Sequence, residues 1–210
     1  MIITYYGKQF FKVQQGDLTI ALNPIAKESD YKGTAARFGA DIVLSTLHHP
    51  DYNGLETVTY GEREPFIVDG PGDFEVKNVF IKGAMTKTLL DKKEYINTVY
   101  SFIVDGITVV FLGGIQDLSP EAKELITDAD ILFVPVGEPF VAPGAAYKLA
   151  VSLESSIVIP MDFGSMQSGE LKQFLKEGGA EKVTEIDKLT IKKKDLEGKV
   201  GEIVLLSYGA

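Results

Sequence analysis

One pattern of secondary structure occurs twice in this sequence, and it constrains the fold more than any other feature. Each copy has a hairpin strand, a helix and a short apolar strand that opens with Ala-Asp-Ile, at residues 40–42 and again at residues 129–131. A short continuous apolar run is typical of a strand covered on both faces. Chance recurrence of a common tripeptide is the alternative, but the order of the elements matches as well. We therefore predict an α/β architecture of two similar halves, with two sheets inside and helices outside, in one domain over residues 1–210.

Local signals place these elements along the chain. Asp105-Gly106 predicts a two-residue hairpin turn, Ser119 followed by Pro120 predicts the start of a helix, and Gly39 is expected to end an earlier one. The predicted strands cover residues 2–5, 10–14, 18–22, 42–44, 66–68, 72–76, 79–82, 98–104, 107–112, 131–136, 157–159 and 203–206. The predicted helices cover residues 31–38 and 120–127, with two more indicated by the apolar spacing of residues 146–153 and 171–175.

The chemistry open to the chain is limited by its lack of cysteine and by its only two histidines, the adjacent His48 and His49. Without Cys there are no disulfides, no thiolate nucleophiles and no Cys-based zinc sites. The sequence also lacks a Gly-x-Gly-x-x-Gly phosphate loop and a Gly-x-Ser-x-Gly nucleophile elbow. Several common classes of enzyme are therefore excluded.

The charge balance argues against nucleic acid as a partner. The formal net charge is −9 and the pI is near 4.8, whereas phosphate-backbone binding relies on clustered Lys and Arg. The basic run Lys192-Lys193-Lys194 is typical of a solvated edge on such a background. No apolar run approaches the roughly 20 residues that span a membrane, and the N-terminus does not read as a secretory signal. We expect a soluble, cytoplasmic protein with no membrane and no nucleic-acid partner.

Short motifs spread along the chain share their order with one protein family. They are Leu22-Asn23-Pro24, the strand 42–44 with Ser45, Pro71-Gly72-Asp73-Phe74-Glu75, Pro135-Val136-Gly137 and Ile159-Pro160-Met161. With the opening strands, this order resembles the metallo-β-lactamase superfamily, in its branch of β-lactamase-fold zinc-dependent hydrolases. Asn23 stands where that family usually has Asp. The resemblance covers essentially the whole chain and implies a four-layer αββα sandwich.

The family's chemistry depends on a His-x-His-x-Asp-His motif after the buried strand, with two later His and a bridging Asp. These residues hold one or two metal ions, and a metal-bound hydroxide attacks the substrate. Carried over by position, the resemblance retains His49 and Asp51 from the motif. Asp162 stands where the last His would be and is a possible substitute ligand.

The remaining ligand positions carry side chains that bind metals poorly, and one of these positions is a glycine, which has no side chain. The resemblance places Leu47 at the first His, Tyr52 at the last His of the motif, Phe111 at the later His and Gly114 at the nearby Asp. Two His and no Cys cannot build a His-rich binuclear site in any register. We predict that Leu47 and Phe111 are buried near each other and fill the volume that the ligands would occupy.

Three functions remain open from the sequence. The leading hypothesis is a protein of this fold that has lost most metal ligands and acts as a non-catalytic module binding a small molecule or a protein. The second is a metal-dependent hydrolase with a reduced mononuclear site, in which His49, Asp51 and Asp162 hold Zn or Mn and Asp51 and Asp162 are the candidate catalytic residues. The third is a metal-independent enzyme in the same cleft, for which no catalytic constellation can be named. The leading hypothesis needs no cofactor, and the sequence does not fix the oligomeric state.

Overall fold

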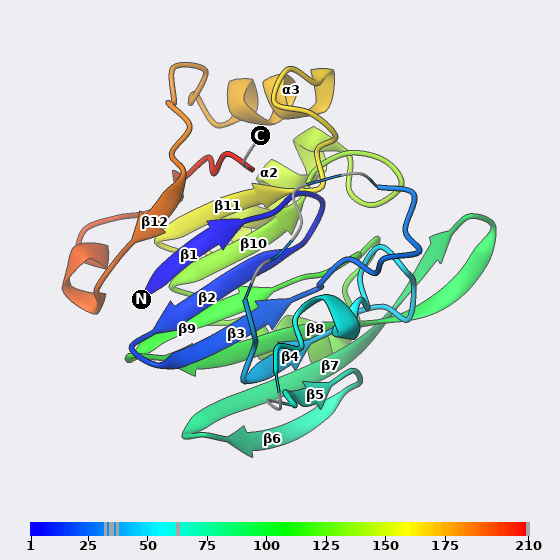
Figure 1. Ribbon diagram of the computed structural model, residues 1–210. Helices are drawn as coiled ribbons and strands as arrows, with labels where there is room; N and C mark the ends of the chain where they lie inside the picture. The colour runs from blue at the N-terminus through cyan, green and yellow to red at the C-terminus, as the bar shows by residue number, and fades with distance from the viewer. Residues whose placement is uncertain (32, 34–35, 37, 62–63, 209–210) are drawn as a thin grey trace.

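Two mixed β-sheets pack face to face in the computed structural model, which describes residues 1–31, 33, 36, 38–61 and 64–208 (Figure 1). The first sheet has the order β12 (Lys188–Thr190), β1 (Ile2–Tyr5), β2 (Phe11–Gln15), β3 (Leu18–Leu22), β4 (Ile42–Leu44) and β5 (Phe66–Val68). The second has the order β13 (Glu202–Ile203), β11 (Ile157–Met161), β10 (Ile131–Pro135), β9 (Ile107–Phe111), β8 (Lys93–Val104), β7 (Val79–Leu90) and β6 (Gly72–Val76). The predicted pair of sheets is confirmed.

Aromatic side chains join the two sheets at the centre of the core. The ring of Phe11 on β2 lies 4.7 Å from that of Phe133 on β10 and 6.4 Å from that of Phe111 on β9, both edge to face. All three side chains are fully buried. Such contacts bury large apolar areas and fix how the sheets stack.

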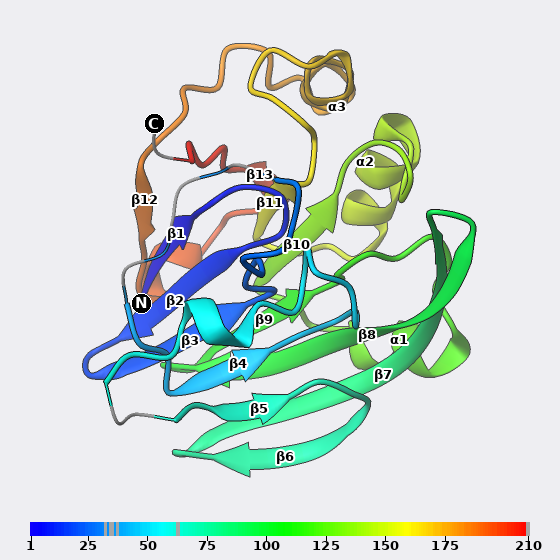
Figure 2. The same cartoon turned by 45° about the vertical axis from the view of Figure 1, so that its right-hand side comes forward.

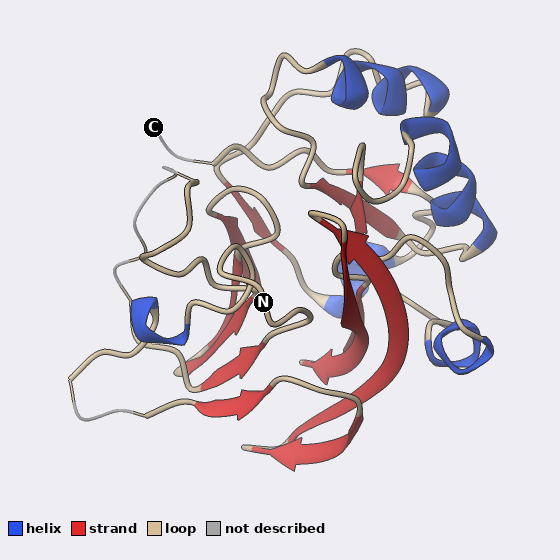
Figure 3. Ribbon diagram, turned by 90° about the vertical axis from the view of Figure 1, so that its right-hand side faces the viewer, coloured by secondary structure: helices blue, strands red, loops and turns tan. Residues whose placement is uncertain are grey.

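The helices lie on the outer face of the second sheet (Figures 2 and 3). Contacts join α1 (Pro120–Leu125) to β7 and β8, and α2 (Pro143–Ser152) to β10 and to α3 (Gly169–Glu177). Ser119 caps α1 as predicted, since its hydroxyl accepts a hydrogen bond from the Ala122 amide at 3.1 Å. None of the helices within the described residues is long and apolar enough to cross a membrane.

The outer face of the first sheet has a thinner cover than the four-layer expectation implies. The described part of this cover consists of loops and the 3-10 turn η1 (Leu55–Thr57), over a small apolar cluster. The cluster comprises Phe10, Ala21, Ala40, Val43 and Val58. The helix predicted for 31–38 falls on a segment in which residues 32, 34–35 and 37 lie outside the described residues. The residues of that segment that are described have no helical assignment.

The two halves of the sandwich repeat one arrangement of hydrogen bonds around the Asp of each Ala-Asp-Ile segment. The Asp41 carboxylate accepts from the Thr19 amide at 2.9 Å, and the Asp130 carboxylate accepts from the Thr108 amide at 2.8 Å. Each Asp amide also donates to the carbonyl of the same Thr, at 2.8 and 2.9 Å. The strands that follow are parallel in both halves, as β3–β4–β5 and as β9–β10–β11. The Asp of Ala-Asp-Ile therefore fixes the register of each buried strand.

A long hairpin extends the second sheet further than the sequence predicts. The strands expected at 79–82 and 98–104 continue into β7 and β8, which are twelve residues long, pair along ten residues each and project beside the sandwich (Figure 1). The alternation of apolar and polar residues does not predict this extension, because its buried positions include polar residues, among them Thr86, Thr88 and Asn97. Its turn, Asp91-Lys92, lacks glycine although both residues have positive φ angles of 51° and 64°.

Candidate functional site

Loops that follow four strands meet at one end of the sandwich. They are linked through Asn23 after β3, Thr46 after β4, Gly113 after β9 and Asp162 after β11. In open α/β sheets, the carboxyl ends of parallel strands are the usual place for a site. This is also where the resemblance places the metal ligands.

A chain of buried amide side chains connects these loops. The Asn23 amide donates to Gln9 Oε1 and to Thr46 Oγ1, both at 2.9 Å, and its Oδ1 accepts from the Thr46 backbone amide at 2.8 Å. Gln9 Nε2 then donates to Asp162 Oδ2 at 3.0 Å. Gln9 and Asn23 are fully buried. Asn23, at the position where the family has Asp, thus supplies donors that an ionised carboxylate could not supply.

The Asp162 carboxylate is held by hydrogen-bond donors from the protein. Besides Gln9, the Tyr52 hydroxyl donates to Asp162 Oδ2 at 2.8 Å, and the Asp162 amide donates to the Lys8 carbonyl at 2.8 Å. Burial raises the pKa of Asp162, and the Lys8 charge and the hydrogen bonds from Tyr52 and Gln9 only partly offset this effect. Burial beside this carboxylate also raises the pKa of Tyr52 well above its ordinary value, so the hydroxyl stays protonated.

The ammonium of Lys8 occupies the space next to Asp51. Lys8 Nζ lies 2.6 Å from Asp51 Oδ2, and 5.7 and 5.8 Å from the ring centroids of Tyr31 and Tyr52. The Ser29 hydroxyl donates to the other carboxylate oxygen. Burial raises the pKa of Asp51, but the hydrogen bonds from Lys8 and Ser29 and the charges of Lys8 and His49 outweigh burial and bring it below the ordinary value. Burial, with the charges of Tyr208 and Asp162, raises the pKa of Tyr31 to about 12.

The two histidines make loop contacts. His49 Nδ1 accepts from the Asp51 amide at 3.2 Å, which leaves Nε2 3.6 Å from Asp91 Oδ2, at the tip of the long hairpin. The centroid of its ring lies 5.8 Å from the ring centroids of both Tyr52 and Tyr95. His48 is exposed, with Nε2 3.1 Å from the Asp69 carbonyl.

Apolar side chains occupy the positions at which the resemblance expects metal ligands. Leu47 and Phe111 are fully buried, as predicted. A Cβ placed on Gly114 would lie 2.6 Å from Leu47 Cδ1 and 2.6 Å from Phe140 Cε1, so an Asp side chain there would collide with both. Phe140 is therefore a second filler beside Leu47, which sequence reasoning missed. The proximity of Phe111 to Leu47 remains a prediction, since the rings known to contact Phe111 are those of Phe11 and Phe133.

This donor set does not fit the metal that the family implies. Across the described part of the chain, no three His, Cys, Asp or Glu side chains form a group that could hold a metal ion. The structure places His49 beside Asp51 and joins the Asp162 amide to the Lys8 carbonyl, but Asp162 is not among the residues that line the cleft at Asp51. Asp51 is engaged by an ammonium, and Asp162 is engaged by a hydroxyl and an amide. Sequence reasoning missed Lys8 and Gln9, because nothing marks the turn between two strands as a source of site residues.

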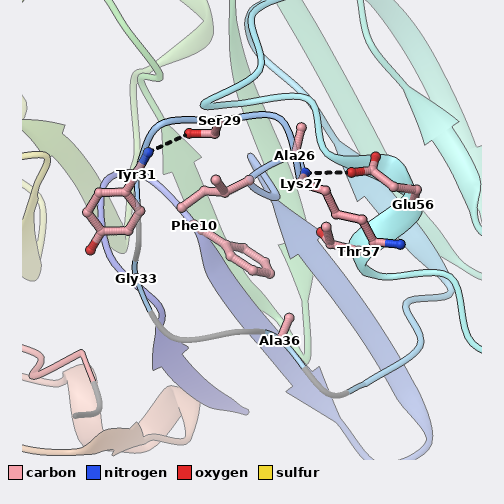
Figure 4. A pocket seen from close by; sticks show the side chains of 10 residues that line it. Phe10, Ala26, Lys27, Ser29, Tyr31, Gly33, Ala36, Glu56 and Thr57 are labelled. Carbon is pink, nitrogen blue, oxygen red and sulfur yellow. Dashed lines mark hydrogen bonds between the residues drawn. The ribbon is translucent and has the colours of Figure 1, made fainter.

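Two cavities lie on either side of the segment around Ser29 and Tyr31, which line both. The Lys8 cleft, of about 440 Å³, is lined by Lys8, Glu28, Ser29, Asp30, Tyr31, His49, Pro50, Asp51 and Asp91. The second cavity, of about 390 Å³, lies on the outer face of the first sheet, over Phe10 and between Tyr31 and Thr57 (Figure 4). A hydrogen bond of 2.8 Å from the Lys27 amide to Glu56 closes one side of this second cavity. Both volumes suit small molecules.

Comparison with known proteins places the fold in one family. Residues 2–162 match the family model described as the beta-lactamase superfamily domain. The chain therefore belongs to the β-lactamase superfamily, and its sandwich is the metallo-β-lactamase type that the sequence predicted. A search of curated proteins finds no match.

Among the solved structures that resemble the chain are several that are described as hydrolases, some of them metal-dependent. A candidate Zn-dependent hydrolase of the metallo-β-lactamase superfamily from Thermotoga maritima aligns with a TM-score of 0.72 and 24% identity, over 98% of this chain and 97% of its own. A candidate metal-dependent hydrolase from Parabacteroides distasonis aligns with a TM-score of 0.66 and 20% identity, over 98% of this chain and 93% of its own. An isothiocyanate hydrolase from Delia radicum gut bacteria aligns with a TM-score of 0.63 and 14% identity, over 100% of this chain and 98% of its own. At these identities the likeness concerns the fold.

Proposed function

We propose that this protein is a metallo-β-lactamase-fold binding module whose site holds an internal ammonium instead of a metal ion. The ion pair of 2.6 Å between Lys8 and Asp51 carries this proposal. A Lys ammonium and a divalent metal compete for the same carboxylate, and a metal site needs several deprotonated ligands that converge. The chain supplies an apolar side chain at Leu47 and no side chain at Gly114, where the family has ligands.

The lack of a nucleophile supports a non-catalytic role. Catalysis in the family relies on a metal-bound hydroxide and on the metal as a Lewis acid. The sequence has no Cys, and its two imidazoles are engaged in loop contacts without a hydrogen bond to a serine within the described residues. The partner is a small molecule or a protein that the Lys8 cleft can admit.

Hydrolysis assays with lactam, thioester and phosphodiester substrates test this proposal. Background rates, with and without Zn or Mn, are the expected result. Activity that Zn or Mn raises, and that Asp51→Ala and Asp162→Ala each abolish, would contradict the proposal. It would favour the reduced mononuclear site of His49, Asp51 and Asp162. Activity that survives both substitutions and a chelator would reject both in favour of a metal-independent enzyme.

A further inference from the structure

The surroundings of the Lys8 ammonium are those of a site that recognises organic amines. A carboxylate lies on one side of Nζ at 2.6 Å, and the rings of Tyr31 and Tyr52 lie within 6 Å of it. Aromatic faces attract ammonium groups through the ring quadrupole, and cages of this composition serve to bind amine ligands. Both phenols are neutral at physiological pH, since the ordinary pKa of tyrosine lies well above it and burial raises the pKa of each further.

The described lining of the cleft also carries four carboxylates against one lysine. Glu28, Asp30 and Asp91 join Asp51 in its lining, and Lys8 is the only lysine among the described residues that line it. The Asp91 side chain is 78% exposed, so this carboxylate is accessible from solvent. Asp51, Tyr31 and Tyr52 together form a cage around the Lys8 ammonium. The Lys8 side chain is 25% exposed and lies on a turn, so it can leave this cage toward the solvent. The volume of about 440 Å³ leaves room for a ligand of several carbon atoms.

We propose that the Lys8 cleft binds a small organic diamine or polyamine. One ammonium of the ligand takes the place of Lys8 between Tyr31 and Tyr52, opposite Asp51. The other faces the outer carboxylates Glu28, Asp30 and Asp91. This inference rests on the proposed function, since it takes the cleft to hold an ammonium and not a metal ion.

Calorimetric titration with 1,4-diaminobutane and n-butylamine tests the ligand class. The parent protein should bind the diamine about tenfold more tightly than the monoamine, because only the diamine can occupy both the cage and the outer carboxylates. Asp91→Asn and Glu28→Gln should each weaken diamine binding about threefold or more. Asp73→Asn is the matched control, since it removes an exposed carboxylate from β6 and should leave the affinity unchanged. Equal losses of diamine affinity in Asp73→Asn and Asp91→Asn would show that the ligand is attracted only by the overall negative charge of the protein, and would overturn the proposal.

Rescue of a cavity variant tests the cage itself. Lys8→Ala removes the internal ammonium, so n-butylamine should bind this variant about tenfold more tightly than it binds the parent and should raise its melting temperature. Lys87→Ala is the control, because it removes an exposed lysine paired with Glu94 at 2.9 Å and should show no rescue. A folded Lys8→Ala that binds the monoamine no better than the parent would overturn the proposal. If Lys8→Ala does not fold, the titrations of the parent, Asp91→Asn and Glu28→Gln decide.

The outcomes separate this inference from the proposed function. A metal ion held in the cleft would defeat the proposed function and this inference together. A metal-free protein that binds neither amine, as parent or as Lys8→Ala, would defeat this inference alone.

Discussion

Lys8 and Asp51 form an ion pair of 2.6 Å in which neither side chain is more than a quarter exposed. The pair lies at the end of the sandwich where metallo-β-lactamase relatives are expected to hold metal. Lys8 is positioned by its own backbone, since its carbonyl accepts from the Asp162 amide and from the Tyr5 hydroxyl, at 2.8 and 2.7 Å. The backbone of Lys8 is therefore held in a position from which its ammonium reaches Asp51.

Loss of the Asp51 charge should destabilise the protein at neutral pH. The folded pKa of Asp51 lies below its ordinary value, so the folded state binds fewer protons than the unfolded state between those two pKa values. Its contribution is present above the ordinary pKa and is lost as the pH falls through the folded pKa. Asp51→Asn should lower the free energy of unfolding at pH 7 by about 1–3 kcal/mol. Urea unfolding should show this difference shrinking in acid, and a difference that persists unchanged would refute the assignment.

Asp162 should behave in the opposite way. Burial raises the folded pKa of Asp162, so between its ordinary pKa and its folded pKa the folded state binds more protons than the unfolded state. The free energy of unfolding therefore falls as the pH rises through this window, because the buried carboxylate becomes charged. Asp162→Asn should therefore raise the free energy of unfolding at pH 7, by about 1 kcal/mol, and the gain should vanish in acid. Asn tolerates the positive φ of 55° at this position. A loss of stability at pH 7 equal to that of Asp51→Asn would show that the Asp162 charge is needed.

Restoring a histidine at Leu47 or at Phe111 should not restore a metal site. Both side chains are fully buried in apolar surroundings, so each substitution places an unpaired polar group in the core. We expect a loss of about 1–3 kcal/mol in the free energy of unfolding for either variant. His48→Ala, at an exposed position, is the control and should change little. Full stability of Leu47→His in urea without metal would contradict the filler role.

The repeated Asp–Thr hydrogen bonds predict matched effects in the two halves. Asp41→Ala removes an acceptor from the Thr19 amide, and Asp130→Ala removes an acceptor from the Thr108 amide. Each should cost about 1–2 kcal/mol in thermal or urea unfolding. A large loss of stability for one variant and none for the other would show that the hydrogen bonds repeat in geometry but do not stabilise the two halves equally.

Much of the fold follows from local patterns in the sequence. The buried strands after residues 41 and 130 are short apolar runs, and Ser119-Pro120 begins a helix as its capping chemistry requires. The long hairpin could not be predicted in the same way. Thr86 and Asn97 satisfy each other across its two strands by a hydrogen bond of 2.9 Å, so polar residues occupy positions where the pattern requires apolar ones.

The site was predictable only where the family pattern supplied positions. His49, Asp51 and Asp162 were named because they align with the metal motif. The structure places His49 and Asp51 in the lining of the Lys8 cleft, while the buried Asp162 contacts Lys8 through its backbone amide. Lys8 and Gln9 come from a turn distant in sequence, and only tertiary packing brings them to Asp51 and Asp162. Tyr52 was recognised as a lost ligand, but its donation to Asp162 depends on burial that no local pattern reports.

Metal binding by the purified protein tests the central claim most directly. The protein is incubated with excess Zn or Mn, dialysed against metal-free buffer and submitted to elemental analysis beside Lys8→Met, which removes the internal ammonium. We expect far less than one metal ion per parent chain, because Lys8, Tyr52 and Gln9 already engage the two carboxylates. About one tightly held ion per parent chain, lost in Asp51→Ala and Asp162→Ala, would contradict this claim.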